Sequence, residues 1–425
     1  MRHVAFRRFL TARIFANVGA QMVTVAVGYQ IYQLTRNPLD LGLVGLSQFL
    51  PFVVLILPAG QAADRLDRRR IVGACYATLA LCDVALAAFS VIGLTSPLPI
   101  FAVMTLFGAT RAFNMPTGQA LLPNLVPRSD FGSAVAINSS TLQVATIAGP
   151  AIGGLVFLAG PGVVYGSVAV LMAVASLLTF SIGAGGRQQA ATEPITLGEV
   201  FSGVAFVRSR PVVLGSISLD LFAVLFGGAV ALLPVYASDI LRVGPTGLGV
   251  LRAMPAVGAA LCGAALSAWP LTRHVGRWML GGVAVFGISN VIFGISTSFV
   301  LTLVALAAGG AADMVSVYVR HLLVQLETPD RIRGRVSAVN SVFIGASNEL
   351  GEFESGVTAA WWGTVPAVLV GGVASIVIAG LWSRLFPSLR TLDRFPGPVR
   401  VEERERVAAS AEGSVQSDPV GGSGS

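Results

Sequence analysis

Apolar stretches recur along most of the chain and are separated by short polar or charged segments. Each is close to the length of about 20 residues that a helix needs to cross the hydrocarbon core of a membrane, whereas barrel strands would be shorter and would alternate apolar with polar residues. The pattern therefore predicts twelve membrane-spanning helices and an all-α integral membrane fold. The predicted spans lie at approximately 9–34, 41–63, 71–93, 98–121, 133–158, 162–183, 211–238, 247–270, 277–297, 299–324, 335–360 and 364–386.

Composition agrees with this prediction. The chain has 425 residues, of which 54% are hydrophobic and 12% are charged, while soluble domains carry about 25% charged residues. The first span is too long and too rich in polar residues for a cleaved signal peptide, so we expect it to be retained.

The basic residues are all arginines, and they gather in alternate connections. Clusters precede the first predicted span and follow the second, eighth and tenth, whereas the connections on the opposite side carry mainly Arg36 and Arg242. Because basic residues favour the cytoplasmic side of a membrane, both termini are expected to be cytoplasmic. The net charge of +7 then reflects topology and indicates no nucleic-acid partner.

No pattern indicates catalysis, a metal site or a cofactor. Cys75, Cys82 and Cys262 lack the spacing of metal ligands and fall within predicted spans, where we expect them to pack. The chain contains no recognisable array of nucleophile, base and orienting group, and no phosphate-binding loop. It is therefore predicted not to be an enzyme.

The chain divides into two similar halves. The segment "PRSDFGSAVAINS" from Pro127 matches "PDRIRGRVSAVNS" from Pro329. Two homologous bundles of six helices follow, and parallel repeats of this kind place the substrate site between the halves, near the membrane midplane.

The boundaries of these parts come from the long polar segments. The predicted parts are an N-terminal bundle over 1–183, a cytoplasmic linker over 184–210 with a short amphipathic helix at 196–208, a C-terminal bundle over 211–387, and a disordered cytoplasmic tail over 388–425. The tail ends in GGSGS, which resembles an added linker and carries no functional argument.

The loop after the second span reads "GQAADRLDRRR". In spacing and position it resembles the signature loop of the major facilitator superfamily. The resemblance implies a cytoplasmic gate in which Gly60 lets helices approach closely and Asp64 faces the start of the eleventh helix, near Arg333 and Arg335. The alternative is a solvated charge cluster that only sets topology. The gate would comprise Gly60, Asp64, Arg65, Arg68 and Arg69.

The fifth span contains "ATIAGPAIGG" and resembles the helix motif of the superfamily's antiporters. Proline bends a membrane helix, and glycines admit a close neighbour across the interface between the halves. This motif favours export by antiport over uptake; a kinked packing interface is the alternative. Its residues are Gly149, Pro150, Gly153 and Gly154.

The eleventh span carries the carboxylates of "GASNELGEFESG". At helical spacing Glu349 and Glu352 share one face with Asn348, while Glu354 points elsewhere. Two neighbouring carboxylates in a low dielectric do not both ionise readily, so this pair, together with Asp313 in the tenth span, is predicted to couple transport to protons. The alternative is a buried network that fixes the eleventh helix against the second.

Further polar and charged residues stand in spans that would line a central cavity, since the resemblance implies that helices one, four, seven and ten surround it. Arg13 and Arg320 could instead reach the membrane surface, and Arg111 with Asp313 could instead form a structural ion pair. The predicted cavity residues are Arg13, Asn17, Gln21, Arg111, Asn114, Asp220, Arg320, Asn340 and Asn348.

The resemblance to the major facilitator superfamily covers residues 1 to about 390, and within it the chain looks like the branch that exports enterobactin. It implies proton-coupled efflux of a small organic molecule, such as a siderophore or drug, by alternating access of a monomer in the bacterial inner membrane. An importer, a carrier of lipid-like substrates and a membrane assembly protein without transport remain as alternatives.

Overall fold

A computed structural model describes residues 4–93, 95–183, 197–329 and 332–396. Helices make up nearly all of these residues, and no strand occurs among them. The first half contains α1(Val4–Thr35), α2(Pro38–Arg65), α3(Arg68–Ile92), α4(Leu98–Leu121), α5(Phe131–Val156) and α6(Pro161–Phe180), with short 3-10 turns at Leu122–Asn124, Arg128–Asp130 and Phe157–Ala159. The second half contains α7(Leu197–Ser209), α8(Pro211–Phe226), η4(Ala229–Leu232), α9(Leu233–Val235), the π-helical turn η5(Tyr236–Ile240), α10(Gly244–Ala268), α11(Val275–Ile295), α12(Phe299–Glu327), α13(Arg333–Trp362), α14(Thr364–Leu385) and α15(Pro387–Arg390).

Eleven helical segments within the described residues are long and apolar enough to cross a membrane. The remaining predicted span, the eleventh along the chain, is α13, whose three glutamates set it apart from these segments, although it is a continuous helix packed between α2, α8 and α14. The all-α membrane fold predicted from hydropathy is therefore confirmed. The short helix expected near the linker corresponds to α7, while residues 184–196 and 397–425 lie outside the described part of the chain.

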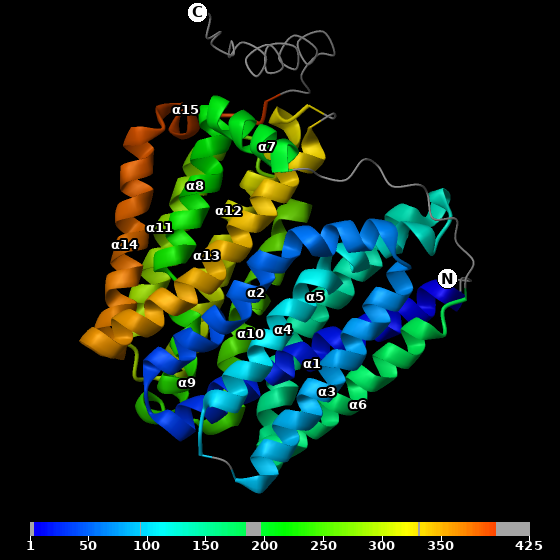
Figure 1. The fold of residues 1–425 in the computed structure, drawn as a ribbon. Helices are drawn as coiled ribbons and strands as arrows, with labels where there is room; N and C mark the ends of the chain where they lie inside the picture. Colours follow the sequence, from blue (N-terminus) through cyan, green and yellow to red (C-terminus); the bar gives the residue numbers. More distant parts are fainter. Residues whose placement is uncertain (1–3, 94, 184–196, 330–331, 397–425) are drawn as a thin grey trace, which may run out of the picture.

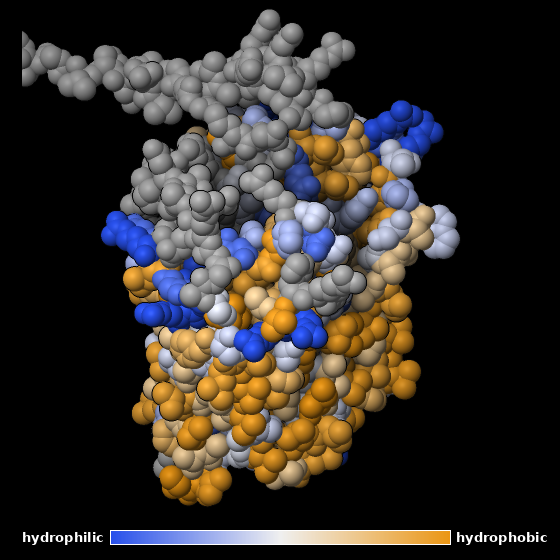
Figure 2. All heavy atoms as spheres, turned by 90° about the vertical axis from the view of Figure 1, so that its right-hand side faces the viewer, coloured by the Kyte–Doolittle hydropathy of each residue, from blue (hydrophilic) through white to orange (hydrophobic). Residues whose placement is uncertain are grey.

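Hydrophobic side chains cover the outside of the helices. Leu81, Leu177, Leu261 and Val300 are each more than two-thirds exposed, as lipid-facing side chains would be. Figure 2 shows one face on which a broad hydrophobic region lies below hydrophilic side chains that gather in the upper part of the view. The distribution matches a protein surrounded by hydrocarbon at mid-height.

The seventh predicted span is interrupted. Helix α8 ends at Phe226, and the chain continues through Gly227 and Gly228 into η4, α9 and the π-helical turn. A Cβ at Gly228 would lie 2.4 Å from the carbonyl oxygen of Gly351 in α13. The break therefore lets the backbone of the seventh span touch α13, and discontinuous helices of this kind surround substrate sites in many transporters.

The two bundles meet at the end that carries α9 and diverge toward the start of α1 and toward α15 (Figure 1). At the closed end α2 crosses α13, where a Cβ at Gly356 would lie 2.8 Å from the Cα of Gly42. Likewise α5 crosses α10, where a Cβ at Gly249 would lie 2.4 Å from the carbonyl oxygen of Pro150. Small residues permit this approach without interhelical voids.

A polar latch joins the bundles at the same end, formed by Tyr32 and Arg36 of the first half and Asp239 of the second. The Tyr32 hydroxyl donates to Oδ2 of Asp239 at 2.6 Å, and an Arg36 guanidinium nitrogen donates to Oδ1 at 2.9 Å. Arg36 has a left-handed φ of 52°, which ends α1 and turns the chain toward α2. The π-helical turn in the seventh span carries Asp239 to this position.

At the diverging end, the connection between α2 and α3 is fixed within the first bundle. Asp67 caps α3 by accepting from the Arg69 amide at 3.0 Å, and its carboxylate pairs with the Arg69 guanidinium at 2.5 Å. The hydrogen bonds from Arg69 lower the pKa of the Asp67 carboxyl. The loop is thus a rigid corner of the first bundle.

We predict that Asp67→Ala lowers the free energy of unfolding by about 1 kcal/mol, the usual effect of losing a helix cap. Because the folded-state pKa of Asp67 is lowered, its contribution is present above the ordinary value of 3.8 and is lost as the pH falls through the folded-state value. Denaturant unfolding in detergent checks both points, with Asp67→Asn as the control that keeps a capping side chain. An equal loss at neutral and strongly acidic pH would contradict the ion-pair contribution.

We also predict that Asp239→Ala weakens closure at the latch. Losing a charge-assisted hydrogen bond and an exposed ion pair amounts to about 1–3 kcal/mol, so opening of the closed end should rise at least about fivefold. A cysteine placed at Val44, which lines the cavity, with the three native cysteines replaced, reports opening through its rate of labelling by a membrane-impermeant thiol reagent added only on the side of the membrane that the closed end faces. Asp40→Asn is the control, since no described contact joins Asp40 to the second bundle, and equal labelling in the two variants would refute the latch.

Candidate functional site: a charged cavity between the bundles

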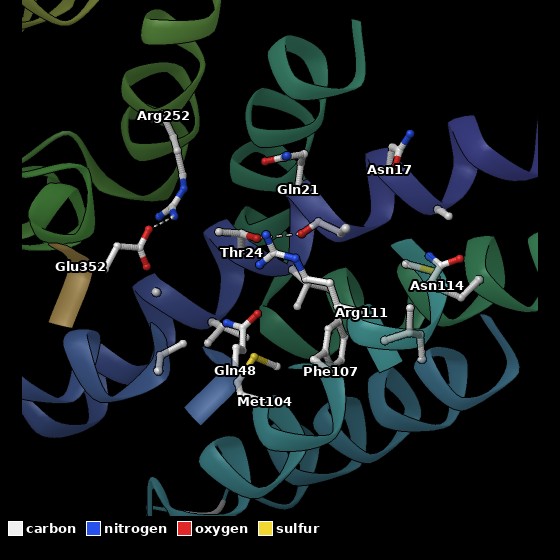
Figure 3. A pocket seen from close by; sticks show the side chains of 18 of the residues that line it. Asn17, Gln21, Thr24, Gln48, Met104, Phe107, Arg111, Asn114, Arg252 and Glu352 are labelled. Atoms are coloured by element: carbon white, nitrogen blue, oxygen red, sulfur yellow. Dashed lines mark hydrogen bonds and ion pairs between the residues drawn. The ribbon is translucent and has the colours of Figure 1, made fainter. Parts of the chain in front are cut away.

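A cavity of about 460 Å³ lies between the two bundles on the open side of the latch. Both bundles contribute to its wall, and Figure 3 shows polar side chains pointing into it from several helices. Apolar side chains of Tyr76, Met104 and Phe107 complete part of the surface. The polar lining consists of Asn17, Gln21 and Thr24 of α1, Gln48 of α2, Arg111 and Asn114 of α4, Arg252 of α10 and Glu352 of α13.

The α1 residues share one face because they recur at three- and four-residue spacing. Thr24 satisfies its hydroxyl locally by donating to the carbonyl oxygen of Ala20 at 2.9 Å. Gln21 packs closely against α5, because a Cβ added at Gly149 would lie 2.5 Å from the Cβ of Gln21. The polar stripe predicted from the sequence therefore faces the cavity at Asn17, Gln21 and Thr24.

Beside the cavity, an ion pair joins the first bundle to the second, in addition to the Arg36–Asp239 pair of the latch. A guanidinium nitrogen of Arg111 in α4 lies 2.6 Å from Oε1 of Glu349 in α13. The Arg111 side chain is 49% exposed and that of Glu349 only 14%, and the guanidinium also stacks over the ring of Phe52. The arginine faces the cavity, and the glutamate supports it from behind.

A second ion pair lies within the second bundle. A guanidinium nitrogen of Arg252 in α10 lies 4.0 Å from Oε1 of Glu352 in α13, and both side chains reach the cavity wall (Figure 3). Here the carboxylate is the more exposed member, at 32% against 14% for the arginine. Glu352 also abuts α2, where a Cβ at Gly45 would lie 3.2 Å from its Oε2.

A third ion pair is enclosed in the second bundle. Arg320 of α12 binds Asp220 of α8, with side-chain exposures of only 3% and 6%. Asp313 lies within electrostatic range of both groups. None of the three residues lines the cavity, and α12 contributes no residue to its wall within the described chain. The alternative of a structural ion pair between Arg111 and Asp313 is not found, because Arg111 pairs with Glu349 while Asp313 lies near Asp220 and Arg320.

The remaining predicted cavity residues lie away from its wall. Arg13 sits between Phe9 and Gly118 inside the first bundle, 5.6 Å from the Phe9 ring centroid. Asn340 is buried in α13, while Asn348 is exposed on the same helix. Of the nine residues predicted to contact substrate, the cavity brings together Asn17, Gln21, Arg111 and Asn114.

The antiporter-like motif packs against two different helices. A Cβ at Gly153 would lie 2.8 Å from the Cα of Met22 in α1, within the same bundle. A Cβ at Gly154 would lie 2.4 Å from the carbonyl oxygen of Pro245 in α10, across the interface. The close approach predicted between the halves thus occurs at Gly154, with Pro150 touching Gly249, whereas Gly149 and Gly153 hold α5 against α1.

The expected gate loop is not closed in this structure. Apart from its chain neighbours and the nearby backbone of α2, no described atom lies within 4 Å of the position that a Cβ would take at Gly60, so the close approach expected there is absent. Arg68 and Arg69 donate to the carbonyl oxygens of Ala120 and Ile182, both in the first bundle. The bundles diverge at this end, which accounts for the difference. Arg65 is exposed, and the side chains of Asp64, Arg333 and Arg335 lie outside what the structure describes.

Sequence reasoning missed Arg252, Gln48 and Asp239. Arg252 carried a usable signal, because an arginine within a predicted span is costly and marks a functional or structural partner. Gln48 stands among apolar residues and gave a weaker signal of the same kind. The position of Asp239 depends on the π-helical turn, which alters the helical register after Tyr236. Such a turn is not encoded in hydrophobic spacing.

Comparison with known proteins places the chain in a family. The profile of the family described as "Transmembrane secretion effector" matches residues 1–399. The chain belongs to this family of the major facilitator superfamily. The enterobactin exporter EntS of Escherichia coli O1:K1 is 26% identical over 407 residues, covering 94% of this chain and 96% of the relative. The same protein in strain UTI89 of that species has the same identity and coverage.

Two solved structures have the same fold. A bacterial homologue of the human lysosomal transporter Spinster, in an inward-facing and unoccupied conformation, superposes with a TM-score of 0.74 at 13% identity, covering 91% of this chain and 98% of that one. The nucleoside transporter NupG superposes with a TM-score of 0.68 at 17% identity, covering 91% and 99%. The protein is thus a multi-pass membrane transporter of the major facilitator type.

We predict that the enclosed pair is structural. Asp220→Ala leaves Arg320 charged and buried without its carboxylate, which costs about 3–5 kcal/mol of stability. The double variant Asp220→Ala/Arg320→Met removes both charges and should recover much of this loss. Thermal unfolding in detergent measures the stability of the parent, the single variant and the double variant. Glu349→Ala is the control and should have a smaller effect, because its arginine partner is half-exposed. A double variant no more stable than Asp220→Ala would refute the charge argument.

Proposed function

We propose that the protein exports a small organic molecule in exchange for protons, by alternating access of the central cavity. One observation supports this most strongly: charged side chains from both bundles meet in a cavity that is closed at one end by a latch and helix crossings. Arg111 and Glu349 belong to different bundles, so any rocking of one bundle against the other must break or rearrange their contact.

The orientation of this cavity follows from the arginine distribution. With both termini in the cytoplasm, the diverging end faces the cytoplasm, and substrate enters from there. Rocking about the cavity would open the latch and bring the gate loop of Gly60, Asp64, Arg65, Arg68 and Arg69 toward the start of α13. Proton-coupled export then proceeds from the bacterial cytoplasm across the inner membrane.

Proton coupling is assigned to Glu352 and Glu349, with Asp313 as a further group in the second bundle. Glu352 faces Arg252 of α10, lies one helical turn from Glu349, and is within electrostatic range of Arg111 of α4. Protonation of Glu352 removes its negative charge and so weakens its attraction for Arg252 and for a cationic or donor group on the substrate. A ligand shifts the equilibrium between states only through such a difference in binding.

The substrate class follows from the relatives. Because the enterobactin exporters resemble the chain over nearly its full length, a siderophore-like molecule is the first candidate. The antiporter-like packing of Gly149, Pro150, Gly153 and Gly154 supports export over uptake. A monomer suffices for this mechanism, since one chain supplies both bundles and the cavity.

Everted membrane vesicles test the proposal with enterobactin as the probe. An imposed inside-acid gradient should drive accumulation, and Glu352→Gln should abolish accumulation above equilibrium, because the side chain can no longer release a proton. Glu354→Gln is the matched control: it makes the same change two residues away on α13, at a position that does not line the cavity. Accumulation that survives collapse of the gradient would refute proton coupling.

A further inference from the structure

The two ion pairs at the cavity are arranged in opposite senses. In the pair that crosses the bundles, the cation Arg111 faces the cavity and its anion is behind it. In the pair within the second bundle, the anion Glu352 is the more exposed member, and its cation Arg252 is largely covered. The cavity therefore offers a guanidinium on the wall of the first bundle and a carboxylate on the wall of the second.

Both exposed groups have unused hydrogen-bonding capacity. A guanidinium has five N–H donors, and the described contacts of Arg111 are one hydrogen bond to Glu349 and stacking on Phe52. The nearest described cation to Glu352 lies 4.0 Å away, beyond hydrogen-bond length. Each group can bind a ligand of opposite charge without first losing its supporting partner.

Aromatic and sulfur-containing side chains lie beside these charges. Tyr76 of α3 and the α4 pair of Met104 and Phe107 contribute to the cavity wall (Figure 3 shows the α4 pair). Rings of this kind pack against flat apolar groups in offset or edge-to-face geometry, and methionine adapts to irregular ones. The middle of a ligand that spans the two charges would meet this apolar surface.

We propose that the cavity selects dipolar substrates: molecules with an aromatic or apolar centre, an anionic group that binds Arg111, and a cationic or strongly donating group that binds Glu352. The inference rests on the proposed function in that it assigns a substrate class to the same cavity. Asn17, Gln21, Gln48 and Asn114 supply further donors and acceptors around the ligand.

Binding to the purified full-length protein in detergent, at one pH and without a gradient, tests this inference separately from transport. The probes are para-(aminomethyl)benzoate and homologues with longer methylene spacers before the carboxylate. Their single-charge analogues are para-toluate and para-methylbenzylamine. Calorimetry is expected to show at least one dipolar homologue binding about fivefold tighter than either analogue, the factor that one additional, partly exposed ion pair contributes.

Substitutions identify which wall of the cavity binds which charged group of the ligand. Glu352→Gln should remove the preference for the amine while keeping that for the carboxylate, and Arg111→Gln should do the reverse. Glu354→Gln on α13 and Arg384→Gln at the exposed end of α14 are the controls, since neither residue lines the cavity. Loss of folding in either cavity variant is excluded by its thermal unfolding profile, and the conservative Arg111→Lys should restore part of the carboxylate preference.

Three results would overturn the inference. The first result is that a single-charge analogue binds as tightly as every dipolar homologue. The second is that both cavity variants retain the preference for the amine and the preference for the carboxylate. The third result is that no homologue saturates binding up to about 10 mM, a concentration at which a ligand with a millimolar dissociation constant would bind. Dipolar binding without proton-driven transport would refute the proposed function instead, and proton-driven transport without dipolar preference would refute only this inference.

Discussion

The structure depends on how charged side chains are paired inside an apolar molecule. Each unpaired charge near the centre of a membrane helix costs about 2.5–3.5 kcal/mol on insertion scales. The chain meets this constraint with Arg111 and Glu349, Arg252 and Glu352, and Arg320 and Asp220. The enclosed third pair stabilises one bundle, whereas the first two border a cavity and can exchange partners.

Close helix packing places the second of these pairs. Helix α13 approaches α2 and the interrupted seventh span through glycine contacts, so the Glu352 carboxylate lies where two bundles and a cavity meet. Larger residues at those crossings would separate the helices and admit lipid or water. The same crossings close one end of the molecule, so a change in how the bundles meet would alter both access and the surroundings of Glu352.

Much of the fold could be predicted from the sequence, because membrane insertion depends on apolar runs and arginine placement that are local and additive. The partners of the charged residues could not. Helical spacing puts Glu349 and Glu352 on one face but does not say which neighbouring helix that face meets. For Arg111 the sequence offered only Asp313 as an alternative partner. In the folded protein, Arg111 instead forms an ion pair with Glu349, and Asp313 lies near Arg320. The break after Phe226 and the π-helical turn also escaped prediction, since the break lies in a long apolar run and a π-helical register is not encoded in hydrophobic spacing.

The charge of the substrate and the direction of coupling are not independent. An anion that displaces Glu352 from Arg252 leaves the carboxylate without its cation and strengthens its hold on a proton, so anion and proton bind cooperatively, as in a symporter. A cationic or donating group at Glu352 competes with the proton, as an antiporter requires. By reciprocity of linkage, the proton weakens that ligand by the same factor. Export by antiport therefore requires that the substrate bind Glu352 through a cationic or hydrogen-bond-donating group. Arg111, on the other wall of the cavity, remains available for an anionic group of the substrate.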